Sequence, residues 1–394
     1  MSRERLKIAI VTITYTSFTG VELYIYELSK RLSELGHEVI ILCPSPTGEI
    51  VERTQKNGVG VYAFNDCPAG WVPDVVHANE ELPSAYALMK WPRTAVVATV
   101  HSQFAVERPL LSSRIHAYIC IRQEIIDHVK LNYHLPASQL HLIYNGFDFE
   151  RFRKAKHSAH HGKRTILFVG TIDAIRRQSI EHLIEYTKKE HLTLRVVGKR
   201  YEDYLDNPPA HVEMLPPRWN VEELFTPDVV ATAGVLLGRS TIEGWVAGLP
   251  GWIYDIDTEG NIKDVSLHPV PEDIDKFNIR NVTDAIVELY RDAMIHNNYD
   301  TEVYLGDMSA VASSLIDRSI TQGMMIHELI AHCDYLEKTL SGQYEQINQL
   351  RDEYQHLQPH VNQLDKKIRT FESTSPAVVY GKLKRRFINK RKDT

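Results

Sequence analysis

Residues 238–255 read Gly-Arg-Ser-Thr-Ile-Glu-Gly-Trp-Val-Ala-Gly-Leu-Pro-Gly-Trp-Ile-Tyr-Asp. This stretch predicts a turn, a short helix that carries Glu243, a Gly-Leu-Pro break and an apolar strand. Such a unit directs backbone N–H groups and a helix N-terminus at one point, which suits a diphosphate. Arg239 adds positive charge there, and Glu243 can accept hydrogen bonds from two neighbouring hydroxyls of a ribose. An ordinary turn between a helix and a strand is the alternative, and the rest of the chain decides between them.

The composition is typical of a globular protein and excludes several classes. The 394 residues allow two domains and an appendage. A net charge of −6 argues against general nucleic-acid binding, so no nucleic-acid partner is expected. The four cysteines have no metal-ligand spacing, which fits a reduced, cytoplasmic protein. We also expect no signal peptide, and no apolar run reaches the ~18–20 residues that cross a bilayer.

Strand-like and helix-like segments alternate along most of the chain. The run Leu6–Thr14 is apolar and rich in β-branched residues, as expected of a buried parallel strand. A helix follows from Gly20 to Gly36, and the same order resumes at Thr165–Gly170 after a polar linker. The alternation predicts the α/β class, with two Rossmann-like domains that face each other across a cleft at the carboxyl ends of their strands.

These patterns also predict the domain boundaries. We expect a Rossmann-like N-terminal domain over residues 1–153 and a second Rossmann-like domain over 154–300. The helix at Val282–Met294 is expected to close the second domain. A helical segment over 301–334 would then lead into the C-terminal appendage.

Six pieces of sequence occur in an order that is typical of one family. The pieces are Gly20–Val39, Asp74–Ala78, Thr99–Ser102, Ile143–Phe152, Phe168–Gly170 and Val196–Gly198. Over roughly residues 5–300 the chain therefore resembles the GT-B glycosyltransferases of the retaining family 4. The resemblance implies transfer of a sugar from a nucleotide-sugar donor, UDP- or GDP-linked, with retention at the anomeric carbon.

The resemblance also implies roles for residues of the second domain. Glu243 would bind the ribose, and Arg239 with the backbone at Ser240 and Thr241 would face the diphosphate. Such donors stabilise the negative charge that builds up on a leaving diphosphate.

Three further pieces of the chain supply site residues by the same resemblance. Arg176 and Arg177 stand where the family keeps a phosphate-neutralising cation, although an exposed basic turn is the alternative. Gly20 would let the N-terminal backbone approach the phosphates. His101, at a strand end, is the candidate catalytic residue that contacts the donor sugar or polarises the acceptor; a surface histidine is its alternative.

Two features limit the resemblance. The family usually carries two glutamates eight positions apart, and Val235 stands at the first position, so recognition of the donor sugar is expected to differ. Asp255-Ile-Asp257 has the form of a metal-binding DxD motif, but it follows an apolar strand in a different architecture. We therefore interpret it as a turn and predict no metal, and we expect His77 to be structural.

The C-terminal 60 residues have a different composition. Apolar residues with alternating spacings of four and three predict a coiled coil over 335–372, and hence a homo-oligomer. A long helix that packs on the body is the alternative, and Pro359 is expected to kink it. The tail, 373–394, contains seven basic residues among the thirteen of Tyr380–Lys392. This composition predicts peripheral binding of 376–394 to an anionic membrane surface, with a solvated tail as the alternative.

The predicted function is that of a cytoplasmic, retaining, metal-independent glycosyltransferase. It would transfer sugar to a glycan or lipid-linked acceptor in surface polysaccharide synthesis. A nucleotide-sugar epimerase of the same fold is one alternative. A catalytically degenerate GT-B subunit that binds a partner transferase is another, and the absence of a carboxylate at Val235 favours it.

Overall fold

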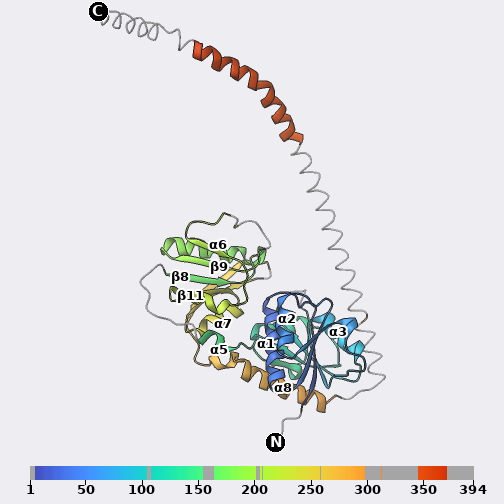
Figure 1. Ribbon diagram of the computed structural model, residues 1–394. Helices are drawn as coiled ribbons and strands as arrows, with labels where there is room; N and C mark the ends of the chain where they lie inside the picture. The colour runs from blue at the N-terminus through green and yellow to red at the C-terminus, as the bar shows by residue number, and fades with distance from the viewer. Residues whose placement is uncertain are drawn as a thin grey trace, which may run out of the picture. The chain divides into compact units, whose positions relative to one another are not determined.

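The computed structural model describes residues 5–103, 108–153, 164–200, 205, 207–257, 259–297, 312 and 345–370. Its internal contacts divide the chain into two compact units, Met1–Leu315 and Ile316–Thr394 (Figure 1). The first unit holds two α/β domains, each built on one sheet. The predicted segment 301–334 is described only at residue 312.

The N-terminal domain is built on a parallel sheet of seven strands in the order β3-β2-β1-β4-β5-β6-β7. These strands are β1 (Lys7–Val11), β2 (Glu38–Cys43), β3 (Gly60–Ala63), β4 (Val75–Asn79), β5 (Ala95–Val100), β6 (Ile115–Cys120) and β7 (Leu140–Leu142). The helices are α1 (Gly20–Glu34), α2 (Glu49–Lys56), α3 (Glu81–Lys90), α4 (Gln123–Tyr133) and α5 (Phe149–Arg153).

Both faces of this sheet are covered, which explains why its strands are almost wholly apolar. Successive residues of β1 alternate between two cores: Ile8 and Ile10 pack with α1 and α2, whereas Ala9 and Val11 pack with α3 and α4. The alternation of apolar strand and amphipathic helix in the sequence therefore corresponds to a three-layer sandwich, as predicted.

The C-terminal domain has a sheet of six strands in the order β10-β9-β8-β11-β12-β13. Its elements are β8 (Thr165–Val169), α6 (Ala174–Lys189), β9 (Thr193–Val197), β10 (Val212–Leu215), β11 (Val229–Val235), α7 (Arg239–Val246), β12 (Gly251–Ile256) and β13 (Ile262–His268). All neighbours are parallel except β13, which runs antiparallel to β12. β13 is not predicted from the sequence, because this edge strand has an irregular and largely polar pattern.

The last helix of the first unit, α8 (Ile279–Ile295), corrects the sequence analysis. The sequence predicts that this helix closes the C-terminal domain, yet its apolar face packs into the N-terminal core with α1 and the strands β4, β5 and β6. Tyr290 at its centre shares a hydrogen bond of 2.6 Å with Nδ1 of the buried His77. Because Thr99 binds Nε2 of the same ring, His77 is structural, as predicted.

In the second unit, residues 345–370 form one helix that is unbroken through Pro359 (Figure 1). Seven apolar side chains on it are 55–66 % exposed: Ile347, Leu350, Tyr354, Leu357, Val361, Leu364 and Ile368. They keep the predicted alternating spacing of three and four. The basic tail lies outside the described residues, as do 335–344 of the predicted coiled coil. No helix in the described part of the chain is long and apolar enough to cross a membrane.

Candidate functional site

The predicted site residues lie at one edge of each sheet. In the N-terminal domain, Gly20 begins α1 in the connection after β1, and His101 directly follows β5. In the C-terminal domain, Arg176 and Arg177 lie in the first turn of α6 after β8, and Arg239 begins α7 after β11. All these positions follow the carboxyl ends of parallel strands, which is the edge where such sheets bind ligands.

The loop before α1 is organised by Glu22. Its carboxylate accepts hydrogen bonds from the backbone N–H groups of Thr16, Ser17 and Thr19, at 2.7, 3.1 and 3.1 Å. Burial alone would raise the pKa of Glu22, but these bonds and the hydroxyls of Ser17 and Thr19 hold it below its ordinary value. A Cβ atom at Gly20 would meet no atom within 4 Å, so this backbone faces open space.

His101 is buried at the end of β5. Its Nε2–H donates to Oδ1 of Asn79 at 2.9 Å, which leaves Nδ1 as an acceptor with no hydrogen-bond partner in the described residues. Burial lowers the pKa of His101 to about 3, so the ring is neutral at physiological pH. The ring of Tyr24 packs against it edge to face, at 5.5 Å between centroids. Nδ1 can therefore accept a hydrogen bond from a hydroxyl, and the sequence analysis missed Asn79, which fixes this tautomer.

Arg239 has two carboxylate partners. Its Nε donates to Oε1 of Glu243, one turn further along α7, and its Nη2 donates to Oε1 of Glu27 on α1, both at 2.5 Å. The guanidinium also lies over the ring of Phe147, 4.6 Å from its centroid. All three charged side chains are at least 87 % buried, since that of Arg239 is 13 % exposed and those of Glu27 and Glu243 are 3 % and 4 % exposed.

The charges in this group stabilise one another. Burial works against the charged form of Arg239, but Glu27 and Glu243 raise its pKa above the ordinary value, so the guanidinium stays charged. Burial raises the pKa of Glu243, and Arg239 opposes that shift. The structure thus adds Glu27 to the predicted pair of Arg239 and Glu243. Oε2 of Glu243 makes no hydrogen bond within the described residues.

Glu27 is a contact point for several parts of the chain. Its Oε2 accepts the backbone N–H of Asp148 at 2.7 Å, and Nη1 of Arg151 lies 3.6 Å from Oε1. Arg151 in turn forms an ion pair of 2.7 Å with Glu222. The sequence contained one signal for this role, because Glu27 falls between Tyr24 and Leu28 on the apolar face of α1, where a solvated carboxylate is not expected.

The first turn of α7 leaves backbone donors free of a side-chain cap. Gly238 occupies the N-cap position and has no side chain to accept their hydrogen bonds. Ser240 and Thr241, the second and third residues of the helix, are both buried. A Cβ atom at Gly234 on β11 would lie 2.8 Å from Oγ1 of Thr241, so glycine there allows the close approach of strand and helix.

The remaining predicted residues are held by local carboxylates. Arg176 pairs with Asp173, the N-cap residue of α6, and Nε of Arg177 lies 3.1 Å from Glu181. Their side chains are 32 % and 50 % exposed, so both cations remain accessible. Asp257 accepts the N–H groups of two residues in its own turn, at 2.9 Å each, as expected of a turn.

A hollow of about 250 Å³ lies beside Glu27 rather than at the N-terminus of α7. Its lining mixes both signs of charge and combines α1, the segment around α5, Trp219 and the start of α8. The lining residues are Tyr26, Glu27, Lys30, Arg31, Glu34, Asp148, Glu150, Arg151, Trp219, Ile279 and Arg280.

Comparison with solved structures identifies the architecture. The chain is similar to HepE from Anabaena in complex with UDP and glucose, with a TM-score of 0.54 and 13 % identity, over 73 % of this chain and all of that one. It is also similar to AviGT4, a glycosyltransferase involved in avilamycin A biosynthesis, with a TM-score of 0.53 and 15 % identity, over 75 % of this chain and all of that one. The chain has the GT-B fold.

The match to a family sequence model lies in the N-terminal domain. Residues 18–151 match the sequence model of Glycosyltransferase Family 4, a span that includes Gly20, Glu27, Asn79 and His101. A glycosyltransferase from Rickettsia africae is also similar in structure, with a TM-score of 0.50 and 14 % identity, over 79 % of this chain and 99 % of that one. No curated protein sequence matches the chain. The prediction of a GT-B protein that resembles family 4 is confirmed.

Proposed function

We propose that this GT-B protein is a glycosyltransferase that moves a sugar from a nucleotide-sugar donor to a glycan or lipid-linked acceptor. The observation that carries the proposal is the match of residues 18–151 to Glycosyltransferase Family 4 in a chain that has both GT-B domains. Solved structures of similar fold support a nucleotide-sugar donor, since HepE has been crystallised with UDP-glucose. A UDP- or GDP-linked sugar is the proposed substrate.

The C-terminal domain would bind the nucleotide. The uncapped N–H groups of Ser240 and Thr241 are donors for the diphosphate, and the accessible cations Arg176 and Arg177 would neutralise it. Glu243 would accept a ribose hydroxyl through Oε2, because Arg239 binds only Oε1. Arg239 would then orient Glu243 through the hydrogen bond from its Nε.

The transferred sugar would lie toward the N-terminal domain. His101 would accept a hydrogen bond from a sugar hydroxyl through Nδ1, and Gly20 would let the backbone before α1 approach the diphosphate. With no carboxylate at Val235, donor-sugar recognition falls to other groups, of which His101 is one. We propose retention at the anomeric carbon, and transfer that requires no metal because cations and N–H donors stabilise the leaving diphosphate.

The appendage would set where the enzyme works. The exposed apolar stripe of 345–370 is proposed to form a homo-oligomeric coiled coil. The basic segment 376–394 is proposed to bind an anionic membrane surface at the cytoplasmic face, which would bring the enzyme to a lipid-linked acceptor.

A degenerate, partner-binding GT-B subunit is the second candidate. Two observations favour it: Val235 replaces a carboxylate, and Arg239 is already neutralised by Glu27 and Glu243.

The test is incubation of the purified protein with a panel of UDP- and GDP-sugars, with and without a lipid-linked acceptor. Release of free nucleotide that depends on acceptor, with an α-linked product from an α-linked donor, is the expected result. Donor rearrangement without acceptor would instead indicate an epimerase. Absence of both, with the nucleotide bound or unbound, would support the degenerate subunit.

A further inference from the structure

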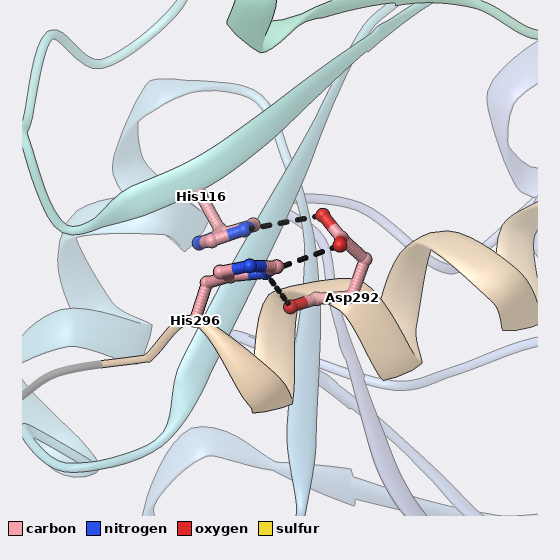
Figure 2. A group of neighbouring side chains, drawn as sticks. All are labelled: His116, Asp292 and His296. Atoms are coloured by element: carbon pink, nitrogen blue, oxygen red, sulfur yellow. Dashed lines mark hydrogen bonds and ion pairs between the residues drawn. The ribbon is translucent and has the colours of Figure 1, made fainter.

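Three metal-ligating side chains meet where α8 ends against the N-terminal sheet. His116 comes from β6, whereas Asp292 and His296 lie one turn apart at the C-terminal end of α8 (Figure 2). One potential ligand atom from each residue lies within 4.8 Å of the other two. Among the described residues this is the one group of three such side chains. None of the predicted nucleotide-sugar residues belongs to β6 or α8.

Two nitrogen–oxygen separations in this group are close to those between ligand atoms around a small metal ion. Nε2 of His116 lies 3.5 Å from Oδ2 of Asp292, and Nδ1 of His296 lies 3.1 Å from Oδ1 of the same carboxylate. Ligand atoms at about 2.0–2.1 Å from a tetrahedral Zn²⁺ are about 3.3–3.4 Å apart, so small side-chain rotations convert this geometry into a coordination shell. Figure 2 shows the ring of His116 directed at the carboxylate of Asp292, and Nδ1 of His296 between that carboxylate and the backbone carbonyl oxygen of Asp292, which lies 3.0 Å from it. The two rings are stacked, with 5.9 Å between their centroids.

The surroundings also favour a cation. Asp292 and His296 stand in the last turn of α8 and just beyond it, where the helix dipole attracts positive charge. Two neutral imidazoles and one carboxylate form a donor set typical of zinc. The side chains of His116, Asp292 and His296 are 24 %, 55 % and 62 % exposed, so an ion has access from solvent.

We propose that His116, Asp292 and His296 bind a divalent transition-metal ion, with Zn²⁺ as the best fit, and that this ion fastens the end of α8 to β6. The role is structural and lies apart from transfer chemistry. α8 follows the C-terminal domain but packs on the N-terminal core, so a metal at its end stabilises the segment that joins the two.

The test is calorimetric titration of the full-length protein with Zn²⁺, after removal of bound metal. We expect the wild type to bind one Zn²⁺ per chain at this group. The double variant Asp292→Asn/His296→Gln, which replaces the two exposed ligands, should lose that binding. The affinity for Zn²⁺ should fall by more than the roughly 10- to 100-fold that is lost when a residue hydrogen-bonded to a metal ligand is replaced. Hydrogen exchange provides a second readout: Zn²⁺ should slow exchange in the C-terminal half of α8 in the wild type and leave it unchanged in the variant.

A matched control tests a second group of histidines that are close together in the sequence. His157, His160 and His161 lie in the polar linker, so the variant with all three replaced by Ala must retain the site. Circular dichroism establishes that each variant is folded. The proposal is overturned if the Asp292/His296 variant binds Zn²⁺ as tightly as the wild type. It is equally overturned if the linker variant loses the site, or if the wild type binds no Zn²⁺.

Discussion

Arg239 and Glu27 join the two GT-B domains through a buried ion pair. The residues are 212 positions apart in the chain, and Nη2 of Arg239 donates to Oε1 of Glu27 at 2.5 Å. The same carboxylate accepts the backbone N–H of Asp148, so it connects α1, the inter-domain segment and α7. Glu27 therefore helps to fix the relative position of α1 and α7, together with contacts such as that of Tyr26 with Trp219.

The first prediction follows from this pair. Glu27→Gln should destabilise the protein by about 3 kcal/mol, the lower end of the range for breaking a buried pair, since Glu243 still neutralises Arg239. Urea denaturation measures the effect as a lower midpoint. Glu34→Gln on the same helix is the control, because its side chain is 47 % exposed and its loss should cost less than about 1 kcal/mol. Equal midpoints for the two variants would contradict the role of Glu27.

The second prediction concerns Glu243 and the ribose. Glu243→Ala should weaken binding of the nucleoside diphosphate by about 1–3 kcal/mol, because hydrogen bonds to a charged group are lost. Calorimetry with UDP and GDP measures it, and Glu185→Ala on the exposed side of α6 is the control. Unchanged affinity in a folded Glu243→Ala protein would remove this residue from the nucleotide site.

Much of the fold could be predicted because local pattern determines it. The run Leu6–Thr14 is apolar since a parallel strand is covered on both faces, and that signal needs no knowledge of distant residues. The place of α8 could not be predicted in this way. Its periodicity shows that one face is buried, but the periodicity does not state which sheet covers that face.

The site shows the same division. The strand-end position of His101 follows from the motif pieces, and the position of Arg239 at the start of a helix follows from the stretch 238–255. The partners Asn79 and Glu27 arise from tertiary contacts. The place of Glu27 on the apolar face of α1 indicates that its carboxylate is buried, but the sequence does not indicate that its partner is Arg239, 212 positions away.

The third prediction is a loss of stability at acid pH that depends on His101. Burial lowers the pKa of His101 to about 3, while an unfolded histidine titrates near 6.5. Below about pH 6.5 the unfolded state binds a proton that the native state does not. The free energy of unfolding therefore decreases as the pH is lowered from about 6.5 to about 3. The slope is about 1.4 kcal/mol per pH unit for one such histidine.

Urea denaturation between pH 7 and pH 4.5 measures this slope. His101→Gln should reduce it but not abolish it, because burial also lowers the pKa of His77 to about 3. The exposed His268 on β13 serves as the control, and His268→Gln should leave the slope as in the wild type. An identical slope in His101→Gln and the wild type would show that His101 is not held neutral by burial.

The fourth prediction is that sugar transfer survives chelation. EDTA should leave the turnover of the transferase essentially unchanged, because N–H donors and arginines act on the diphosphate. Removal of zinc from the site at His116 should lower thermal stability only. The measurement is initial rate with and without EDTA, followed by addition of Mn²⁺. If EDTA abolished the activity, Mn²⁺ restored it in the wild type, and Mn²⁺ failed to restore it in Asp255→Asn/Asp257→Asn, a metal would be assigned to those aspartates.

The fifth prediction concerns the oligomer. In the helix of 345–370, three of the four positions of one series are β-branched: Ile347, Val361 and Ile368, with Tyr354 as the fourth. The alternating series is leucine throughout: Leu350, Leu357 and Leu364. β-Branched residues at a with leucine at d favour a parallel two-stranded coiled coil, so we expect a dimer.

Leu357→Asp tests this expectation, because it places two carboxylates in the apolar seam of a dimer and removes two leucines whose burial is worth about 1.5–3 kcal/mol each. Sedimentation equilibrium should give a dimer for the wild type and a monomer for the variant at micromolar concentration. Gln355→Asp introduces the same side chain two positions away, on the outer face of the heptad, and should remain dimeric. A monomeric wild type would show that the exposed stripe does not associate with itself, and a trimer would show that the packing at a and d does not select two strands.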